Sequence, residues 1–246
     1  MIVFDHLFFI GLAVVYPVLS WLSYRKLCRR MAAGEVINPV EIYRSTIAAL
    51  WSLFGIAIVL WLLTDRSWHE LGLGLNVDAG FVIGLLLTIG AIAAVVRQFG
   101  GMDAADDKTR KAWRRQLGDL RVIVPRDDRQ LRLFYAMSAT AGIVEETLWR
   151  GYLIWYLGHA MPVWAAAIAS AVIFGFGHAY QGTASVPKIA LVGGVFAALY
   201  LLTGSVWLPM LLHAIFDAVQ GRAASRVLGG NEDESNSATG SDTSNP

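Results

Sequence analysis

Long apolar runs alternate with shorter polar segments along most of the chain. A helix that crosses a bilayer needs about 20 mostly apolar residues. The last two runs are shorter, so we expect those helices to be tilted or sheltered by neighbours. The pattern predicts seven spanning helices, over residues 2–24, 42–63, 80–96, 133–157, 163–179, 189–203 and 206–219.

A polar segment at residues 97–132 separates the third predicted span from the fourth. It holds ten Lys and Arg residues and six Asp residues. Within it, residues 112–120 place Trp113, Leu117 and Leu120 at spacings of four and three, which indicates an amphipathic helix on the membrane surface. Its basic face is typical of a lipid-facing or topogenic element.

The basic residues also predict how the chain is oriented. Residues 25–44 hold five Lys and Arg residues, whereas residues 64–79 hold one, Arg66. Lys and Arg are enriched in cytoplasmic loops. With seven spans, all the basic segments fall on one side, so we expect the N-terminus outside and the C-terminus in the cytoplasm.

The composition favours an all-α, multi-pass protein of the cell membrane, with the lipid bilayer as a partner. Hydrophobic residues make up 56% of the chain and charged residues 16%, compared with about 45–50% and about 25% in soluble domains. The net charge is only +1 and the basic residues lie at span ends, so we expect no nucleic-acid partner. The single cysteine, Cys28, excludes an internal disulfide and a thiolate metal cluster.

Three regions follow from these patterns. Residues 1–128 are expected to form three N-terminal spans and the basic cytoplasmic segment, and residues 129–222 a core of four helices. Residues 223–246 are expected to be a disordered acidic tail, because the sequence from Gly229 onward has four acidic residues and no basic ones.

The fourth span carries three ionisable residues, Glu145, Glu146 and Arg150. A charged side chain at membrane depth costs at least about 2.5–3.5 kcal/mol, so such residues need a role. Glu146 and Arg150 are four positions apart and can pair on one helix face. Glu145 is rotated by about 100° and is free for another purpose.

Two other spans carry ionisable residues in pairs at the same spacing, Phe174 with His178 and His213 with Asp217. At about 1.5 Å per residue, His213 lies roughly 12 Å and Glu145 roughly 16 Å from the cytoplasmic surface, with His178 near it. A tilted fourth span would therefore bring Glu145, His178 and His213 into one cavity in the inner half of the bilayer.

Such a cavity could activate water. A carboxylate can take a proton from water while imidazoles bind a metal or stabilise an oxyanion. Glu145, His178 and His213 also match a catalytic zinc shell with one open position, although the chain has no HExxH sequence. A divalent metal such as zinc and a metal-free mechanism both remain open.

Each pair also has a structural interpretation. Glu146 and Arg150 alone would be an ion pair, His178 alone an interfacial residue, and His213 with Asp217 a polar contact between helices. Their convergence on one leaflet favours function, because each residue carries a burial cost. A transporter that relays protons through these groups is disfavoured, because no pair of discontinuous helices is evident.

Together, the three motifs resemble those of the CPBP family of intramembrane metalloproteases. The motifs are Glu145-Glu146-x-x-x-Arg150, Phe174-x-x-x-His178 and His213-x-x-x-Asp217. The family includes the type II CaaX prenyl endopeptidases and bacteriocin-immunity (ABI) relatives. The resemblance covers roughly residues 129–222.

The resemblance implies an endopeptidase that hydrolyses a peptide bond of a membrane-associated protein or peptide, with prenylated CaaX proteins as the best-known case. It gives Glu145 the role of general base and His178 that of holding the water. His213 and Asp217 would face the oxyanion, braced by Glu146 and Arg150. The alternative is a non-catalytic immunity or scaffold protein of the same fold.

One position departs from the stricter pattern. Asp217 stands where the prenyl endopeptidases have Asn, and an ionised Asp cannot donate a hydrogen bond to an oxyanion. Our hypothesis is that Asp217 instead orients His213, as a carboxylate does for a metal-binding or protonated imidazole.

Overall fold

The computed structural model describes residues 2–101 and 106–229, and every regular element within them is helical. The all-α prediction is therefore confirmed for this part of the chain. The predicted acidic tail lies outside the described residues from position 230 onward. The elements are, in chain order, α1 (Val3–Ile10), η1 (Gly11–Val15), α2 (Tyr16–Ala32), α3 (Pro39–Leu62), α4 (Ala79–Gly100), α5 (Asp107–Leu117), η3 (Gly118–Ile123), α6 (Asp128–Glu145), η4 (Glu146–Leu153), α7 (Ile154–Gly158), α8 (Val163–Gly177), η5 (Ala179–Gln181), η6 (Thr183–Ser185), α9 (Val186–Thr203) and α10 (Trp207–Gly229).

Side chains at the N-termini of three long helices fix where these helices begin. Asn38 accepts from the backbone N–H of Val40 at the start of α3, which also has a proline in its first turn. Asp78 caps α4 and Asp127 caps α6 through similar bonds of 2.8 Å. Each cap satisfies one backbone donor that the helix itself leaves free.

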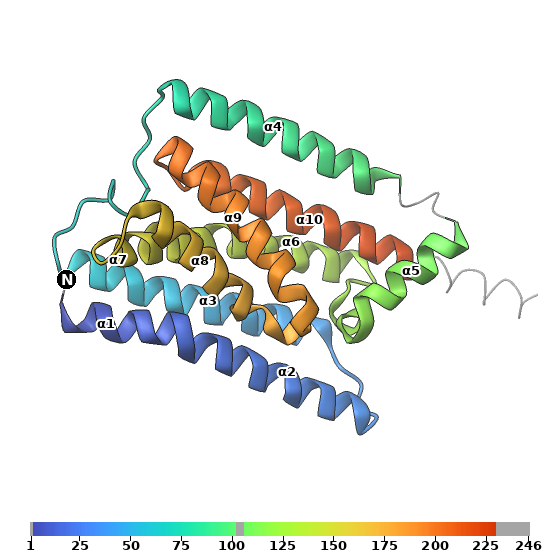
Figure 1. Ribbon diagram of the computed structural model, residues 1–246. Helices are drawn as coiled ribbons and strands as arrows, with labels where there is room; N and C mark the ends of the chain where they lie inside the picture. Colours follow the sequence, from blue (N-terminus) through green and yellow to red (C-terminus); the bar gives the residue numbers. More distant parts are fainter. Residues whose placement is uncertain (1, 102–105, 230–246) are drawn as a thin grey trace, which may run out of the picture.

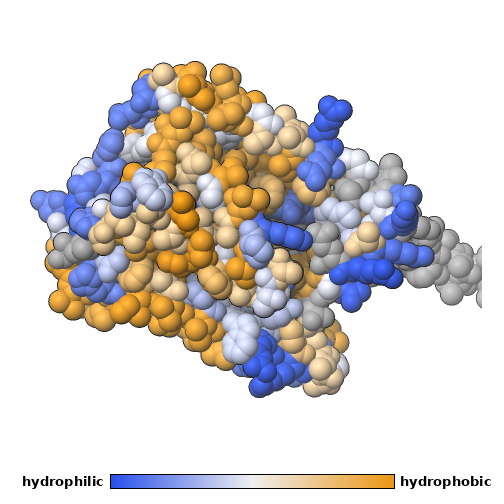
Figure 2. Space-filling model, viewed as in Figure 1, coloured by the Kyte–Doolittle hydropathy of each residue, from blue (hydrophilic) through white to orange (hydrophobic). Residues whose placement is uncertain are grey.

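Among the residues that the structure describes, four helices are long and apolar enough to cross a membrane, over Val3–Ala32, Pro39–Leu62, Ala79–Gly100 and Thr183–Thr203. The other predicted spans also form helices, which lie alongside these four (Figure 1). In Figure 2 apolar side chains cover most of the visible face, and hydrophilic ones gather toward its two ends. This distribution suits a bilayer, and the crossing count and orientation stay predictions.

The helices that carry the second and third motifs, α8 and α10, pack against α6 and η4, which carry the first motif. α10 packs on α6 so closely that a Cβ added at Gly142 would lie 2.7 Å from the carbonyl oxygen of Met210. A glycine is therefore needed there. α8 packs against η4 and against α9, so the helices carrying Glu145, His178 and His213 are neighbours.

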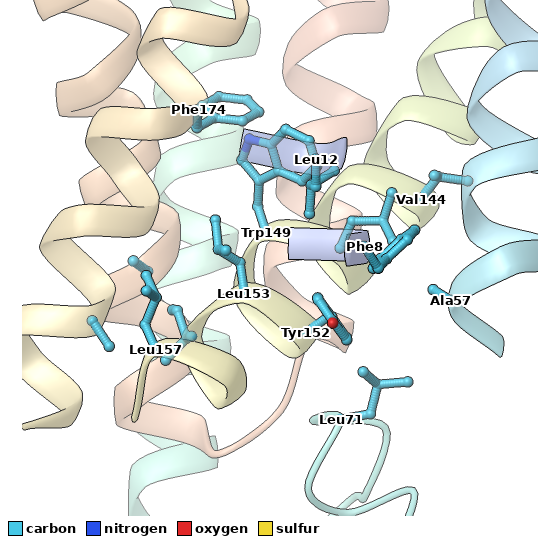
Figure 3. Packing of buried hydrophobic residues seen from close by; sticks show 14 of the residues in the cluster. Phe8, Leu12, Ala57, Leu71, Val144, Trp149, Tyr152, Leu153, Leu157 and Phe174 are labelled. Atoms are coloured by element: carbon cyan, nitrogen blue, oxygen red, sulfur yellow. The ribbon is translucent and has the colours of Figure 1, made fainter. Parts of the chain in front are cut away.

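The core is centred on η4. Leu148 and Leu153 are fully buried there, as is Val144 near the end of α6. Phe8 and Leu12 pack into the same cluster beside Tyr152 (Figure 3). They belong to the continuous helix Val3–Ala32, formed by α1, η1 and α2, which we call the N-terminal rod. The N-terminal rod thus covers one side of the segment that carries the acidic motif.

A buried ion pair between Asp5 and Arg66 holds the N-terminal rod against the rest of the bundle. Arg66 donates two hydrogen bonds to the Asp5 carboxylate, at 2.8 and 2.6 Å, and Asp5 has no exposed surface. The Tyr152 hydroxyl donates to the Asp5 backbone carbonyl at 3.0 Å. The only basic residue of the 64–79 loop therefore holds α1 against η4, a contact that local sequence patterns did not indicate.

Two boundary predictions are wrong. Residues 223–229 continue α10 instead of starting the tail, with Ala223 and Val227 buried. The amphipathic helix occupies Asp107–Leu117, and its Trp113 packs edge-on against Phe99, 5.5 Å between ring centroids, and beside Ala223 and Val227. This apolar face is thus covered by the ends of α4 and α10, because these helices extend further than the hydrophobic pattern indicated.

Candidate active site

The acidic motif lies where an α-helix becomes a π-helix. α6 ends at Glu145, and Glu146 opens the π-helical segment η4. π-helical turns are rare and are frequent at functional sites. No sequence pattern indicated this wider turn, which sets the direction of the Glu146 and Arg150 side chains.

Glu146 joins two helices through a single oxygen. Its Oε1 accepts from Arg150 Nη1 at 3.0 Å, which confirms the predicted ion pair, and lies 2.7 Å from His213 Nδ1. Arg150 also donates from Nη2 to the carbonyl of Gly193 at 3.0 Å. Glu146 and Arg150 have no exposed surface, so this network is a structural link between η4, α9 and α10.

Aromatic rings enclose the same network. The Arg150 guanidinium lies over the rings of Phe174, at 4.5 Å, and Phe196, at 5.3 Å. His213 stacks on Phe196 with a centroid separation of 5.2 Å. Cation–π contacts of this kind are strongest when the cation is desolvated. Phe174, a motif residue, therefore supports Arg150, and Phe196 is a supporting residue that the motifs did not identify.

Trp149 packs with these aromatic rings and is not one of the ionisable motif residues. Its indole N–H is buried without a hydrogen-bond acceptor in the described residues. The ring lies edge-on to Phe174, and Figure 3 shows the nitrogen directed toward that ring. An N–H facing the π-cloud is a weak but recognised contact.

Glu145 is directed differently from Glu146, as its position on the helix predicted. Its Oε2 lies 3.9 Å from His213 Nε2, and Asp217 Oδ2 lies 3.5 Å from the same nitrogen. His213 therefore has Glu146 at one ring nitrogen, and Glu145 and Asp217 at the other. Such surroundings suit an imidazole that donates from both nitrogens.

His178 terminates α8 beside this group. Its Nδ1 lies 2.9 Å from the Phe174 carbonyl oxygen, and its ring packs on Phe174 and stacks on Tyr180. With the proton on Nδ1 for that bond, Nε2 is an acceptor. The Phe174 ring also lies edge-on to His213, 6.2 Å between ring centroids, so the three motif helices meet here, and a cavity shared by Glu145, His178 and His213 stays a prediction.

Asp217 is the most exposed of the three side chains around His213 Nε2 and Glu145. The side chain of Glu145 is 11% exposed and that of His213 7%, whereas that of Asp217 is 36% exposed. Burial raises the pKa of Tyr180 to about 12, with the charges of Glu145 and Asp217 adding to the shift. Its hydroxyl therefore keeps its proton at neutral pH and can donate, a feature that the sequence patterns missed.

The divalent metal stays a prediction. Over residues 2–101 and 106–229, no three His, Cys, Asp or Glu side chains are placed so that they could hold a metal ion. Of the predicted set Glu145, His178 and His213, the two histidines have Nδ1 directed at Phe174 O and Glu146 Oε1, which leaves the Nε2 atom of each ring as the one that could face a ligand.

Comparison with known proteins agrees with the site. Residues 128–219 match the family model described as type II CAAX prenyl endopeptidase Rce1-like. The match is consistent with the CPBP family and confirms the resemblance over this segment, which runs from the first residue of α6 into α10 and contains all three motifs. The matched family is a protease family. No curated protein and no solved structure matches the chain.

Proposed function

We propose that this protein is an intramembrane endopeptidase that hydrolyses a peptide bond of a membrane-associated substrate, with Glu145 as the base that activates water. We place it in the cell membrane as a multi-pass protein with its N-terminus outside. A prenylated peptide with a CaaX ending is the substrate class that we propose to test, because the matched family is described by that activity.

The difference between the two glutamates carries the proposal. Glu146 is fully buried, and its Oε1 is already bound by Arg150 and His213. Glu145 retains exposed surface, and its nearest ion-pairing partner, His213 Nε2, is 3.9 Å away. A water molecule can bridge polar groups at such a separation, whereas a direct hydrogen bond cannot form. Glu145 is therefore the carboxylate that can take a proton from water.

The remaining groups fit the steps of amide hydrolysis. The water oxygen attacks the substrate carbonyl while Glu145 accepts the proton, and the Nε2 lone pair of His178 accepts a hydrogen bond from the same water. His213, held by Glu146 at Nδ1, donates from Nε2 to the oxyanion that forms. Glu145 then gives its proton to the leaving amine, so protons and charge balance over the cycle.

The orientation of His213 differs from our sequence-based hypothesis. The shorter contact to His213 comes from Glu146, at 2.7 Å, whereas Asp217 lies at 3.5 Å from the other nitrogen. Glu146 is thus the main orienting carboxylate. Asp217 is placed to hold Nε2 until the oxyanion replaces it as the acceptor.

A conservative variant tests the proposal. Glu145→Gln keeps the side-chain shape and removes the base, so cleavage of a farnesylated CaaX-type peptide by the purified full chain should fall by about 10²–10⁴-fold. Glu41→Gln, a change at an exposed carboxylate in the first turn of α3, should leave the rate unchanged. A Glu145→Gln protein that cleaves as well as wild type would show that Glu145 is not the base. A wild-type protein that cleaves no such peptide would instead support the non-catalytic immunity or scaffold role.

A further inference from the structure

A cavity adjoins the candidate active site. It lies between the end of the N-terminal rod and the connection from α8 to α9, and its volume is about 540 Å³. Its walls include Trp21, Arg25, Cys28 and Arg29 from α2, and Tyr180 from η5. Because Tyr180 also stacks on His178, an occupant of the cavity would be a neighbour of the catalytic chamber.

The cavity presents two cations without an acidic partner. The guanidinium of Arg25 lies 4.7 Å from the centre of the Trp21 ring, which holds its position. Among the residues that the structure describes, neither Arg25 nor Arg29 forms an ion pair, whereas the neighbouring Arg30 binds Glu35 at 2.6 Å. Two guanidinium groups at one cavity suit a phosphate or a carboxylate.

The surroundings of the cavity are those of a membrane interface. The rod Val3–Ala32 is apolar enough to span a bilayer, and Trp and Tyr residues near its basic end are typical of the headgroup level. Val18 and Leu22 are exposed and lie one turn from Trp21 and Arg25 along the same stripe of the helix. An anion bound at the arginines would therefore have apolar surface directly beside it.

We propose that this cavity binds the headgroup of an anionic phospholipid. The phosphate is held by Arg25 and Arg29, and the acyl chains lie along the exposed stripe of Val18 and Leu22. Charge complementarity favours an anionic lipid over a zwitterionic one. The adjoining apolar surface favours a lipid over a free anion. This binding does not depend on the proposed peptidase activity, so it can be measured whether or not the protein cleaves a peptide.

Cys28 provides a direct readout of the cavity. It is the only cysteine of the chain, lines the cavity and is partly exposed. The experiment uses the full chain in neutral detergent, with dihexanoyl phosphatidylglycerol as the probe and dihexanoyl phosphatidylcholine as the uncharged-headgroup comparison. The two measurements are the dissociation constant of each lipid and the rate at which a maleimide alkylates Cys28 as lipid is added.

A matched pair of variants separates the cavity from general surface charge. Arg25→Gln with Arg29→Gln removes two charges from the cavity, whereas Lys26→Gln with Arg44→Gln removes two exposed charges that do not line it. We expect phosphatidylglycerol to protect Cys28 in wild type and in the Lys26/Arg44 variant. The Arg25/Arg29 variant should bind it about 30-fold more weakly, the effect of losing two basic contacts.

Three results would overturn the proposal. One is equal binding of phosphatidylcholine and phosphatidylglycerol. Another is protection of Cys28 by inorganic phosphate at the same concentration as the lipid. The third is that phosphatidylglycerol does not protect Cys28, whereas a peptide with a free terminal carboxylate does and the amide of that peptide does not. If the Arg25/Arg29 variant does not fold, protection of Cys28 in the wild type still decides between these results.

Discussion

Replacing Gly193 by alanine tests whether the buried Arg150 network positions the catalytic groups. A Cβ at this position would lie 3.1 Å from Phe174 Cδ1 and 3.2 Å from Arg150 Nη2. Ordinary contact begins at 3.4 Å, so the two neighbours must move by 0.3 and 0.2 Å. Both are almost completely buried, so the displacement passes to Glu146 and from there to His213.

The size of the effect follows from two opposing terms. Overpacking costs about 1–3 kcal/mol, and alanine in place of a helical glycine returns about 0.5–1 kcal/mol. The net loss of about 0–2.5 kcal/mol should lower the unfolding midpoint by up to about 10 °C. Because catalytic geometry is sensitive to shifts well below 1 Å, we expect kcat to fall about three- to tenfold.

Gly194 provides the matched control for this experiment. It is the next residue of α9, and a Cβ there would meet no atom within 4 Å. Gly194→Ala should keep wild-type kcat and be equally or slightly more stable. The assays are cleavage of a farnesylated CaaX-type peptide and thermal unfolding in detergent. If Gly193→Ala matched Gly194→Ala in both, the proposed coupling of Arg150 to the site would be wrong.

Three further predictions follow from individual contacts. Asp217→Asn should lower kcat by only about 2- to 12-fold, the value of one ordinary hydrogen bond, because Glu146 still holds His213; a loss above about 100-fold would give Asp217 the main role. Arg66→Gln should cost about 3–5 kcal/mol of stability, because the fully buried Asp5 loses its partner; unfolding midpoints equal to those of Arg44→Gln would refute this. In sealed cells, a membrane-impermeant maleimide should label Cys28 only after permeabilisation, and labelling of intact cells would reverse the predicted orientation.

The sequence predicted those features that depend on spacing along one helix. The apolar runs marked the long helices, and the four-residue spacing of Glu146 with Arg150 and of His213 with Asp217 brought each pair together. The His213–Asp217 contact depends on α-helix geometry alone, which is common to all α-helices. The Glu146–Arg150 pair lies in the π-helical segment η4 and still forms.

Contacts between helices were not predictable in the same way. The bond from Glu146 to His213 depends on the π-helical turn that begins at Glu146 and on the rotation of α10 against α6. The Asp5–Arg66 pair joins positions that are 61 residues apart. Trp113 is covered by Ala223 and Val227 because α10 continues beyond its apolar run. None of these is encoded by local periodicity.

The central claim is that the two adjacent glutamates have different roles. Glu145 accepts the proton from water, and Glu146 stabilises the site by binding Arg150 and His213. The most direct measurement compares kcat and the unfolding midpoint for Glu145→Gln and Glu146→Gln. We predict that Glu145→Gln loses cleavage while keeping the wild-type midpoint. Glu146→Gln should lose about 3–5 kcal/mol of stability, because Arg150 is left buried without its counter-ion. A Glu145→Gln protein that still cleaves, or a Glu146→Gln protein as stable as wild type, would contradict the account.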